Sequence, residues 1–264
     1  MRRIALTSLA IVITLATFAH AEEWKKSFNI SGKPSLKVET SDANIQVDTW
    51  DQNTIEARVT TEGYKIGEGG IRVIDRQNGD TVELEVRYPH RYFSFEVGNH
   101  HHVDIEIRMP KEGRVDLHTG DGKIQLTHFK GDMDLNSADG HQDIDSVEGN
   151  LHAHAGDGQI RAAGRFDGLD VSTGDGRIEV MARSGSALTR SWTLQTGDGA
   201  VTLQVPQNLA ADIDLHTGDG HINLDMPISV EGRLSERNIR GKLNGGGNLL
   251  TIHTGDGSIR LEKS

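Results

Sequence analysis

Aspartate is the residue type whose spacing in this sequence points most directly to chemistry. It occupies the third position of a four-residue unit that reads T-G-D-G, S-A-D-G or A-G-D-G. Seven copies begin at Thr119, Ser137, Ala155, Thr173, Thr196, Thr217 and Thr254, and a weaker T-S-D-A copy begins at Thr40. The first four of the seven starts are 18 residues apart, and the next gaps are 23, 21 and 37 residues. Carboxylate oxygens suit hard cations such as Ca²⁺, so a stacked column of aspartates is a candidate calcium site.

The calcium interpretation competes with a purely structural one. The candidate ligands are Asp121, Asp139, Asp157, Asp175, Asp198, Asp219 and Asp256, with Asp42 in the weaker copy. On neighbouring strands their carboxylates would lie roughly 5 Å apart and repel by about 1 kcal/mol per pair in water. The sequence lacks the G-G-x-G-x-D-x-hydrophobic-x pattern of calcium-binding β-rolls. An aspartate that accepts backbone hydrogen bonds within its own turn explains the spacing without a metal. We therefore expect no cofactor, and a calcium-binding β-roll-like repeat protein is an alternative.

Histidine forms a second candidate set, because imidazoles suit zinc, copper and nickel. Four histidines directly precede the repeated unit, at His118, His154, His216 and His253, and a separate triplet spans 100–102. Asn136, Ser172 and Gln195 interrupt the column, so only the last two histidines are expected to be neighbours. We expect solvated histidines in both places and predict no metal site.

Catalysis requires one constellation of groups in one pocket, whereas this chain repeats the same Thr, His and Asp at many turns. An outward column of carboxylates at Asp116, Asp134, Asp170 and Asp214 resembles the paired acids of solenoids that cleave carbohydrates. A solvated strand face explains these aspartates as well. The sequence therefore predicts no enzymatic activity and no catalytic residues, with a carbohydrate-active solenoid enzyme as the alternative.

The elements that position these residues are short strands on either side of each turn. Apolar residues alternate with polar ones before the unit, as at Val115 and Leu117, and after it, as at Ile124 and Leu126. The Asp-Gly pair supplies the turn, because glycine adopts positive φ easily. Further glycines, at Gly131, Gly149 and Gly168, are expected to reverse the chain again before the next unit.

The 18-residue spacing favours a parallel β-solenoid over a row of antiparallel hairpins, because identical columns then lie over one another and share one core. We predict an all-β chain with a single elongated solenoid over 115–264. Gln142 replaces an isoleucine, so its coil is expected to be looser or bulged. The 37-residue gap is close to two periods and is expected to contain a degenerate coil around 239–243.

Residues 22–114 are predicted to form an antiparallel β cap that belongs to the same continuous body. One hairpin joins 71–74 to 82–86 around Asn78-Gly79 by a loop longer than two residues, and a second joins 93–97 to 103–107. A cap of this kind shields the open apolar end of a solenoid.

Residues 1–21 are predicted to be a cleaved secretory signal. Arg2 and Arg3 precede an apolar run over 4–18, and Ala19-His20-Ala21 fits a small-x-small cleavage site. The run is shorter than the roughly 20 residues of a membrane-spanning helix. Cleavage after Ala21 leaves no second apolar run of membrane length.

The amino-acid composition limits the classes of partner that this chain is expected to bind. The chain has no cysteine, which excludes disulfides and thiol chemistry, and its formal net charge is −11. An acidic surface repels nucleic acid and anionic lipid, so neither is an expected partner.

Taken together, these motifs resemble the bacterial "putative adhesin" family of exported β-strand-repeat proteins. The resemblance is carried by the unit 36–47, the segment 105–110 before the repeats, the glycine-aspartate turns, and the run 241–247 that leads to 254–259. It implies an exported or envelope-associated β-helix with no catalytic residues to transfer. The expected function is a periplasmic or extracellular, cell-surface binding or scaffold module. Its expected partner is an unidentified protein or polysaccharide of the cell envelope.

Overall fold

The structure, a computed structural model, describes residues 22–89, 101–230 and 235–264. The predicted signal, the strand predicted at 93–97 and His100 lie outside the described residues. Within them the chain is all-β, and no helix occurs. The prediction of an all-β fold is confirmed.

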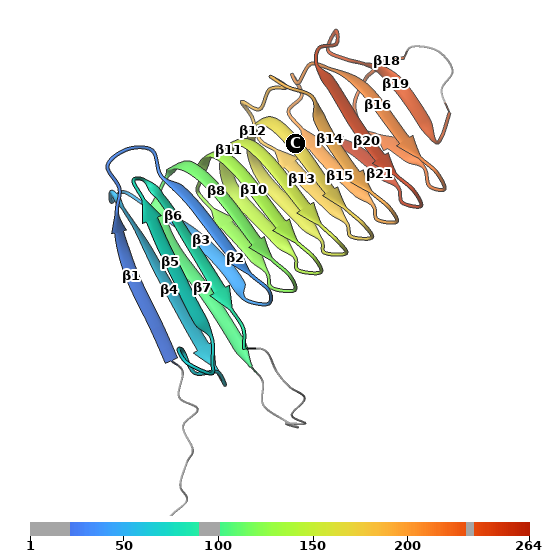
Figure 1. Cartoon of the computed structure of the whole chain (residues 1–264). Helices are drawn as coiled ribbons and strands as arrows, with labels where there is room; N and C mark the ends of the chain where they lie inside the picture. Colours follow the sequence, from blue (N-terminus) through green and yellow to red (C-terminus); the bar gives the residue numbers. More distant parts are fainter. Residues whose placement is uncertain (1–21, 90–100, 231–234) are drawn as a thin grey trace, which may run out of the picture.

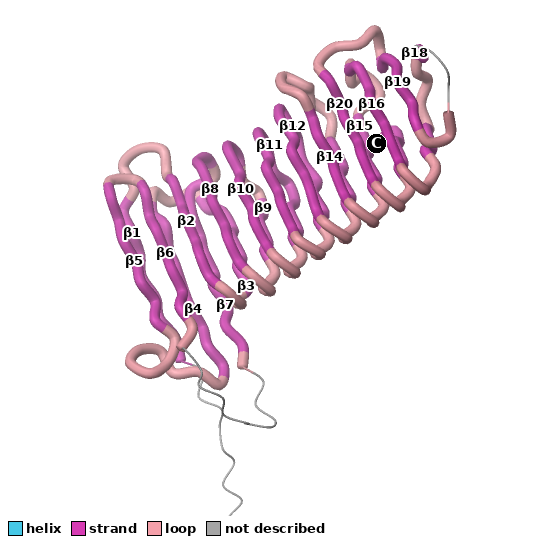
Figure 2. The backbone as a smooth tube through the Cα atoms, turned by 45° about the vertical axis from the view of Figure 1, so that its right-hand side comes forward, coloured by secondary structure: helices cyan, strands magenta, loops and turns pink. Residues whose placement is uncertain are grey.

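The strands form one large mixed sheet that folds into two packed faces (Figures 1 and 2). Face A holds the strands that precede the turns and their neighbours. In spatial order they are β5 (Arg72–Asn78), β6 (Thr81–Arg87), β2 (Ser35–Thr40), β8 (Glu112–Thr119), β10 (Lys130–Ser137), the second halves of β11 (Gln142–Ala155) and β12 (Ile160–Thr173), β14 (Trp192–Thr196), β20 (Leu249–Thr254), β16 (Ala211–Thr217), β19 (Asn238–Leu243) and β18 (Ser229–Val230).

Face B holds the strands that follow the turns. Its spatial order is β1 (Glu22–Asn29), β4 (Thr54–Glu62), β7 (His102–Pro110), β3 (Asn44–Trp50), β9 (Ile124–Thr127), the first halves of β11 and β12, β13 (Ile178–Ala182), β15 (Val201–Val205), β21 (Ile259–Lys263) and β17 (Ile222–Leu224). The alternating apolar side chains of both faces meet between them and form one continuous core.

Coils stack in parallel with the spacing that the repeat predicts. Thr119 pairs with Ser137, Ser137 with Ala155, and Ala155 with Thr173. The weaker copy at Thr40 is the first coil of the stack, since β2 runs parallel to β8 and β3 runs parallel to β9. The expectation of parallel stacking at 18 residues is therefore confirmed.

The order of the last coils in space differs from their order in the sequence. The final coil, β20–β21, lies between the coil of β14–β15 and the coil of β16–β17 (Figure 1). The degenerate coil expected around 239–243 is wrong: this segment is β19, which pairs antiparallel with β16 and covers the end of face A. A single antiparallel strand can close an edge that a further parallel coil would leave open.

Turns that begin with threonine are held by that threonine and by glycine, whereas the units at Ser137 and Ala155 lack it. The Thr173 hydroxyl donates to the carbonyl of Gly158 in the preceding coil at 3.0 Å and accepts from the amide of Gly176 at 3.3 Å. Thr196 and Thr254 repeat both bonds in their own coils. The result is a buried ladder of threonine hydroxyls along one edge of the molecule.

The turn glycines are required for a reason other than the one expected. Gly122, Gly176 and Gly257 do not have positive φ. A Cβ at each of them would lie well under 3.0 Å from the carbonyl group of the preceding turn. The column is therefore glycine because the backbones of successive turns nearly touch.

The second glycine column lies next to the place where the chain reverses from face B to face A. β9 runs away from the T-G-D-G turn and β10 runs back toward the next one, so the chain reverses between them. Gly131 and Gly149 have φ of 137° and 119° and pair with each other at this end of face A. Gly168 is outside this column, because the register shifts after Gly149 and places Gly168 beside Asn150. The expected reversal is confirmed beside Gly131 and Gly149, and Gly168 does not share their position.

Gln142 behaves partly as expected. Its side chain is fully buried, and its amide donates to Ser137 Oγ at 3.0 Å and to the His154 carbonyl at 2.6 Å. Gln142 keeps its register, and the bulge of its coil lies between Asp145 and Val147.

The N-terminal half contains the antiparallel hairpin of β5 and β6, as expected, but only two residues, Gly79 and Asp80, connect the two strands. β7 pairs antiparallel with β4 and parallel with β3. The predicted hairpin partner of β7, at 93–97, lies outside the described residues.

Candidate functional site

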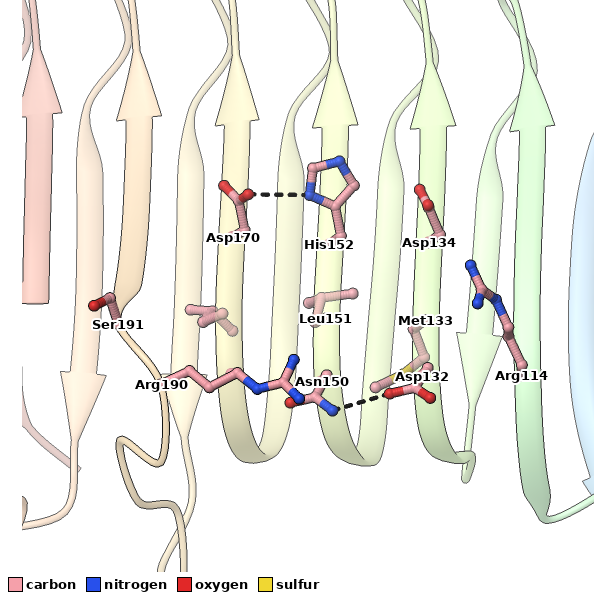
Figure 3. Close-up of a pocket in the computed structure, with 12 residues that line it drawn as sticks. Arg114, Asp132, Met133, Asp134, Asn150, Leu151, His152, Asp170, Arg190 and Ser191 are labelled. Carbon is pink, nitrogen blue, oxygen red and sulfur yellow. Dashed lines mark hydrogen bonds and ion pairs between the residues drawn. The ribbon is translucent and has the colours of Figure 1, made fainter. Parts of the chain in front are cut away.

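A groove on the outer side of face A brings together polar side chains from successive coils. It has a volume of about 460 Å³ and lies over β8, β10, β11 and β12 (Figure 3). Met133, Leu151 and Leu169 lie beneath it, but each has only 2% of its surface exposed because its side chain packs in the core. The surface that a ligand would meet is therefore mainly polar.

Two rows of side chains cross the strands along the groove. In the first row Arg114, Asp132, Asn150 and Gly168 stand side by side on successive strands. In the second row Asp134, His152 and Asp170 do the same. Parallel register produces these rows, because equivalent positions of neighbouring coils lie about 4.8 Å apart.

Each groove carboxylate is held in place by one neighbouring donor. Asn150 Nδ2 donates to Asp132 Oδ1 at 2.9 Å, and Asn136 Nδ2 donates to Asp134 Oδ1 at 2.8 Å. His152 Nδ1 lies 3.2 Å from Asp170 Oδ2 (Figure 3). A carboxylate offers about four acceptor sites, so each of these groups keeps acceptors for a ligand.

The two groove arginines are unpaired. Among the residues that the structure describes, neither Arg114 nor Arg190 forms a side-chain ion pair or hydrogen bond, and both are exposed. Arg190 extends from its loop so that its guanidinium group lies beside Asn150, and Arg114 lies at the other end of the groove (Figure 3). Together they present ten N–H donors, five on each guanidinium, beside the carboxylates.

Gly168 leaves the first row without a side chain on β12. A Cβ at this position would lie 2.8 Å from Asn150 Oδ1 and 3.9 Å from Arg190 Cδ. Glycine is therefore needed here because the Asn150 side chain lies against the backbone of β12.

The outer side of face B is different, because its charges are paired across coils. Asp143 is within 2.5 Å of Lys123 Nζ and within 3.9 Å of an Arg161 nitrogen, and Arg161 is 3.0 Å from Glu179. This ladder satisfies its own charges. The unpaired donors of the groove have no such internal partners, which marks face A as the side suited to a ligand.

The turn aspartates lie on the edge where the coils turn, away from the groove. Asp219 pairs with Arg237 at 3.2 Å. Burial, followed by repulsion from the carboxylate of Asp121, raises the pKa of Asp42. No group of three or more histidine, aspartate or glutamate side chains in the described chain is arranged to hold a metal ion. Calcium binding at this column stays a hypothesis.

The expected pair of histidines is confirmed. His216 and His253 are in register on neighbouring strands, with ring centroids 5.9 Å apart and planes at 82°. His154 contacts Ser172, and His102 contacts Asp104 at 2.9 Å.

Of the four outward aspartates, only Asp134 and Asp170 line the groove. Asp116 pairs in register with Asp134, and Asp214 is 3.2 Å from Arg240 at the far end of the stack. Sequence reasoning missed Arg114, Asn150 and Arg190. The signal that could have found them is the 18-residue spacing of Arg114, Asp132 and Asn150, which places three different hydrogen-bonding groups in one row.

A wider groove of about 820 Å³ lies beside the first coil, next to Tyr88 and Arg72. Burial raises the pKa of Tyr88, and the Tyr88 ring packs edge-on against Tyr64 at 5.7 Å. The chain directly after this groove, from residue 90, is outside the described residues.

A search of the described residues finds no helix with the length and apolar character needed to cross a membrane.

The parallel coils, the ladder of turns and the open groove define a stacked all-β repeat protein. Residues 111–262 match the family described as Toastrack DUF4097, and the chain belongs to this family. The expected kinship with adhesin-type repeat proteins is confirmed. No curated protein matches the sequence.

Several solved structures are similar to this chain. A "putative cell adhesion protein" from Clostridium sporogenes aligns over 93% of this chain and 100% of its own, with 14% identity and a TM-score of 0.45. A "putative adhesin" from Bacteroides fragilis aligns over 91% and 97%, with 12% identity and a TM-score of 0.45. A "putative lipid binding protein" from Parabacteroides distasonis aligns over 90% and 96%, with 14% identity and a TM-score of 0.48. None of these descriptions refers to an enzymatic activity.

Proposed function

We propose that this toastrack protein is an exported, non-enzymatic binding module that engages a component of the cell envelope through the groove on face A. One observation carries the proposal. The groove arginines Arg114 and Arg190 have no ion-pair or hydrogen-bond partners among the described side chains, whereas Arg161 and Arg177 at the opposite face are paired with carboxylates.

Several features support binding over catalysis. The groove is an open trough that crosses four strands, and its polar groups repeat from coil to coil. An active site normally isolates its reacting groups from water, whereas Asp132, His152 and Asp170 are exposed. Repetition along a rigid stack suits an extended ligand, because each coil contributes a similar contact.

Export is part of the proposal. The predicted signal over 1–21 has a basic start, a short apolar run and a small-x-small end. Mass spectrometry of the chain recovered from the envelope or the medium tests this step, and an N-terminus other than Glu22 would refute the cleavage assignment.

Binding is tested with the processed chain and isolated envelope fractions, measured by co-sedimentation and by surface-immobilised binding. The groove variant Arg190→Gln is compared with Arg177→Gln on face B, which removes one charge of the same sign from the surface. Wild type and Arg177→Gln are expected to bind, and Arg190→Gln is expected to lose most of the binding. Equal binding by all three proteins, or no binding by wild type, would refute the groove as the binding surface.

Enzymatic activity on the envelope fraction, the alternative to binding alone, is measured in the same experiment. Asp116 and Asp134 are in register on neighbouring strands, a spacing of about 5 Å that also occurs between the carboxylates of retaining glycosidases. If wild type releases soluble fragments from the envelope fraction that it binds, and Asp134→Asn does not, the protein is an enzyme and not only a binding module.

A further inference from the structure

We infer that the ligand of the face A groove is a neutral, polyhydroxylated polymer, an extended glycan that carries no charge. This inference rests on the proposed function and names the chemical class of the ligand.

Donors and acceptors alternate along the groove in the way that sugar hydroxyls require. A hydroxyl donates one hydrogen bond and accepts two, so it is best satisfied by one group of each kind. The first row presents Arg114 as a donor, Asp132 as an acceptor and Asn150 as both. The second row presents Asp134 and Asp170 as acceptors on either side of His152. A hydroxyl-rich chain lying between the rows therefore meets donors on β8 and β11 and carboxylate acceptors on β10 and β12.

The charge of the groove argues against charged polymers. Three carboxylates and two guanidinium groups are interleaved, so their fields largely cancel over the length of the groove. A polyanion meets Asp132, Asp134 and Asp170, and a polycation meets the two arginines. The net charge of −11 on the whole chain adds repulsion of polyanions at longer range. A neutral polar ligand avoids both penalties.

The shape of the groove fits an extended ligand that runs across the strands. Four strands at about 4.8 Å spacing give a path of roughly 14 Å between β8 and β12.

The carboxylates are already oriented before a ligand arrives. Asn150 holds Asp132, Asn136 holds Asp134, and His152 holds Asp170. Groups that are fixed in advance lose little conformational entropy when they bind, which matters for a ligand recognised mainly by neutral hydrogen bonds.

The experiment probes the processed full chain against immobilised polysaccharides of three kinds. Dextran, xylan and mannan are neutral, polygalacturonate is anionic and chitosan is cationic. Four proteins are compared: wild type, Arg190→Gln, Gly168→Leu, which forces a bulky side chain against Asn150 in the first row, and Arg177→Gln as the matched control on face B. Circular dichroism melts show whether each variant folds, and Arg190→Gln keeps the test valid if Gly168→Leu does not.

We expect wild type and Arg177→Gln to bind at least one neutral polymer. Loss of a charged donor should weaken that binding by about tenfold or more in Arg190→Gln. Binding should change little between about 0.05 and about 0.5 M salt, because a neutral ligand has no charge to screen.

Three results would overturn the inference: binding of charged polymers only, binding of no polysaccharide, or equal binding by the groove variants. The earlier envelope experiment separates this failure from failure of the proposed function. If envelope binding depends on Arg190 but is destroyed by protease and survives removal of carbohydrate, the binding module stands and its ligand is a protein. If Arg190→Gln binds as wild type in both experiments, both the inference and the proposed function fail.

Discussion

The substitution Gly176→Ala tests why the turns of the stack contain glycine. The added Cβ would lie 2.7 Å from the Gly158 carbonyl carbon and 2.7 Å from Thr173 Oγ1, and closer still to the Gly158 oxygen. Two of these three atoms are backbone of the preceding coil, so relief requires the coil to move and not merely a side chain to rotate.

The expected cost follows from these contacts. Overpacking of a rigid site costs about 1–3 kcal/mol. Movement of the turn also breaks the hydrogen bonds of Thr173 with Gly158 and Gly176, worth about 1 kcal/mol each. Alanine lowers the entropy of the unfolded chain and returns about 0.4–1 kcal/mol. The net loss is about 2–4 kcal/mol.

Urea denaturation followed by circular dichroism measures this loss, and hydrogen exchange of the Ile178 amide shows whether the opening is local. The matched control is Asp175→Ala, one residue earlier, where the side chain is exposed. We expect the control to change stability by no more than about 0.5 kcal/mol. A loss below about 1 kcal/mol in Gly176→Ala, or a larger loss in the control, would refute the close-approach explanation.

Three further predictions concern the ends and edge of the stack. Asp42→Asn should raise the melting temperature at neutral pH, because burial and Asp121 raise the folded-state pKa of Asp42 above its unfolded value. The ionised Asp42 side chain therefore destabilises the folded state at neutral pH. The gain in melting temperature should vanish as the pH falls through the raised pKa toward the unfolded value. A gain in melting temperature that persists at low pH would contradict this cause. The double variant Gln195→Cys with His253→Cys should form a disulfide, because these residues are in register on neighbouring strands. The double variant Gln195→Cys with His216→Cys should not form one, because the final coil separates their strands. Non-reducing electrophoresis that shows the opposite pattern would contradict the spatial order of the coils. Calcium added to chelated protein should leave the melting temperature unchanged, and a saturable rise would establish the aspartate column as an ion site.

Much of the stack could be predicted from local pattern. Alternation with a period of two places Val115 and Leu117 in the core, and the 18-residue spacing sets their register against the next coil. The placement of the final coil could not be predicted. The units at Thr196, Thr217 and Thr254 have the same motif, so each of them can stack on any other. Long-range pairing by β19 selects the observed order.

The groove depended on two local irregularities that residue types do not reveal. A register shift after Gly149 moves Gly168 beside Asn150 and leaves the first row without a side chain on β12. The 23-residue gap between Thr173 and Thr196 is longer than the period, and its loop brings Arg190 to the groove. The longer gap shows that this coil contains extra residues, but it does not show on which face of the stack those residues lie. The role of glycine in the turns was missed for a related reason, because a close backbone approach exists only after coils stack.

The claim that the face A groove holds the ligand is tested most directly by mapping the bound surface. Amide hydrogen exchange of the processed chain is measured with and without a saturating amount of the polymer that it binds. We expect added protection over β10 and the second halves of β11 and β12, around Asp132, Asn150 and Asp170, with no change on β13 or β15. Protection confined to face B or to the edge of T-G-D-G turns would contradict the assignment of the groove.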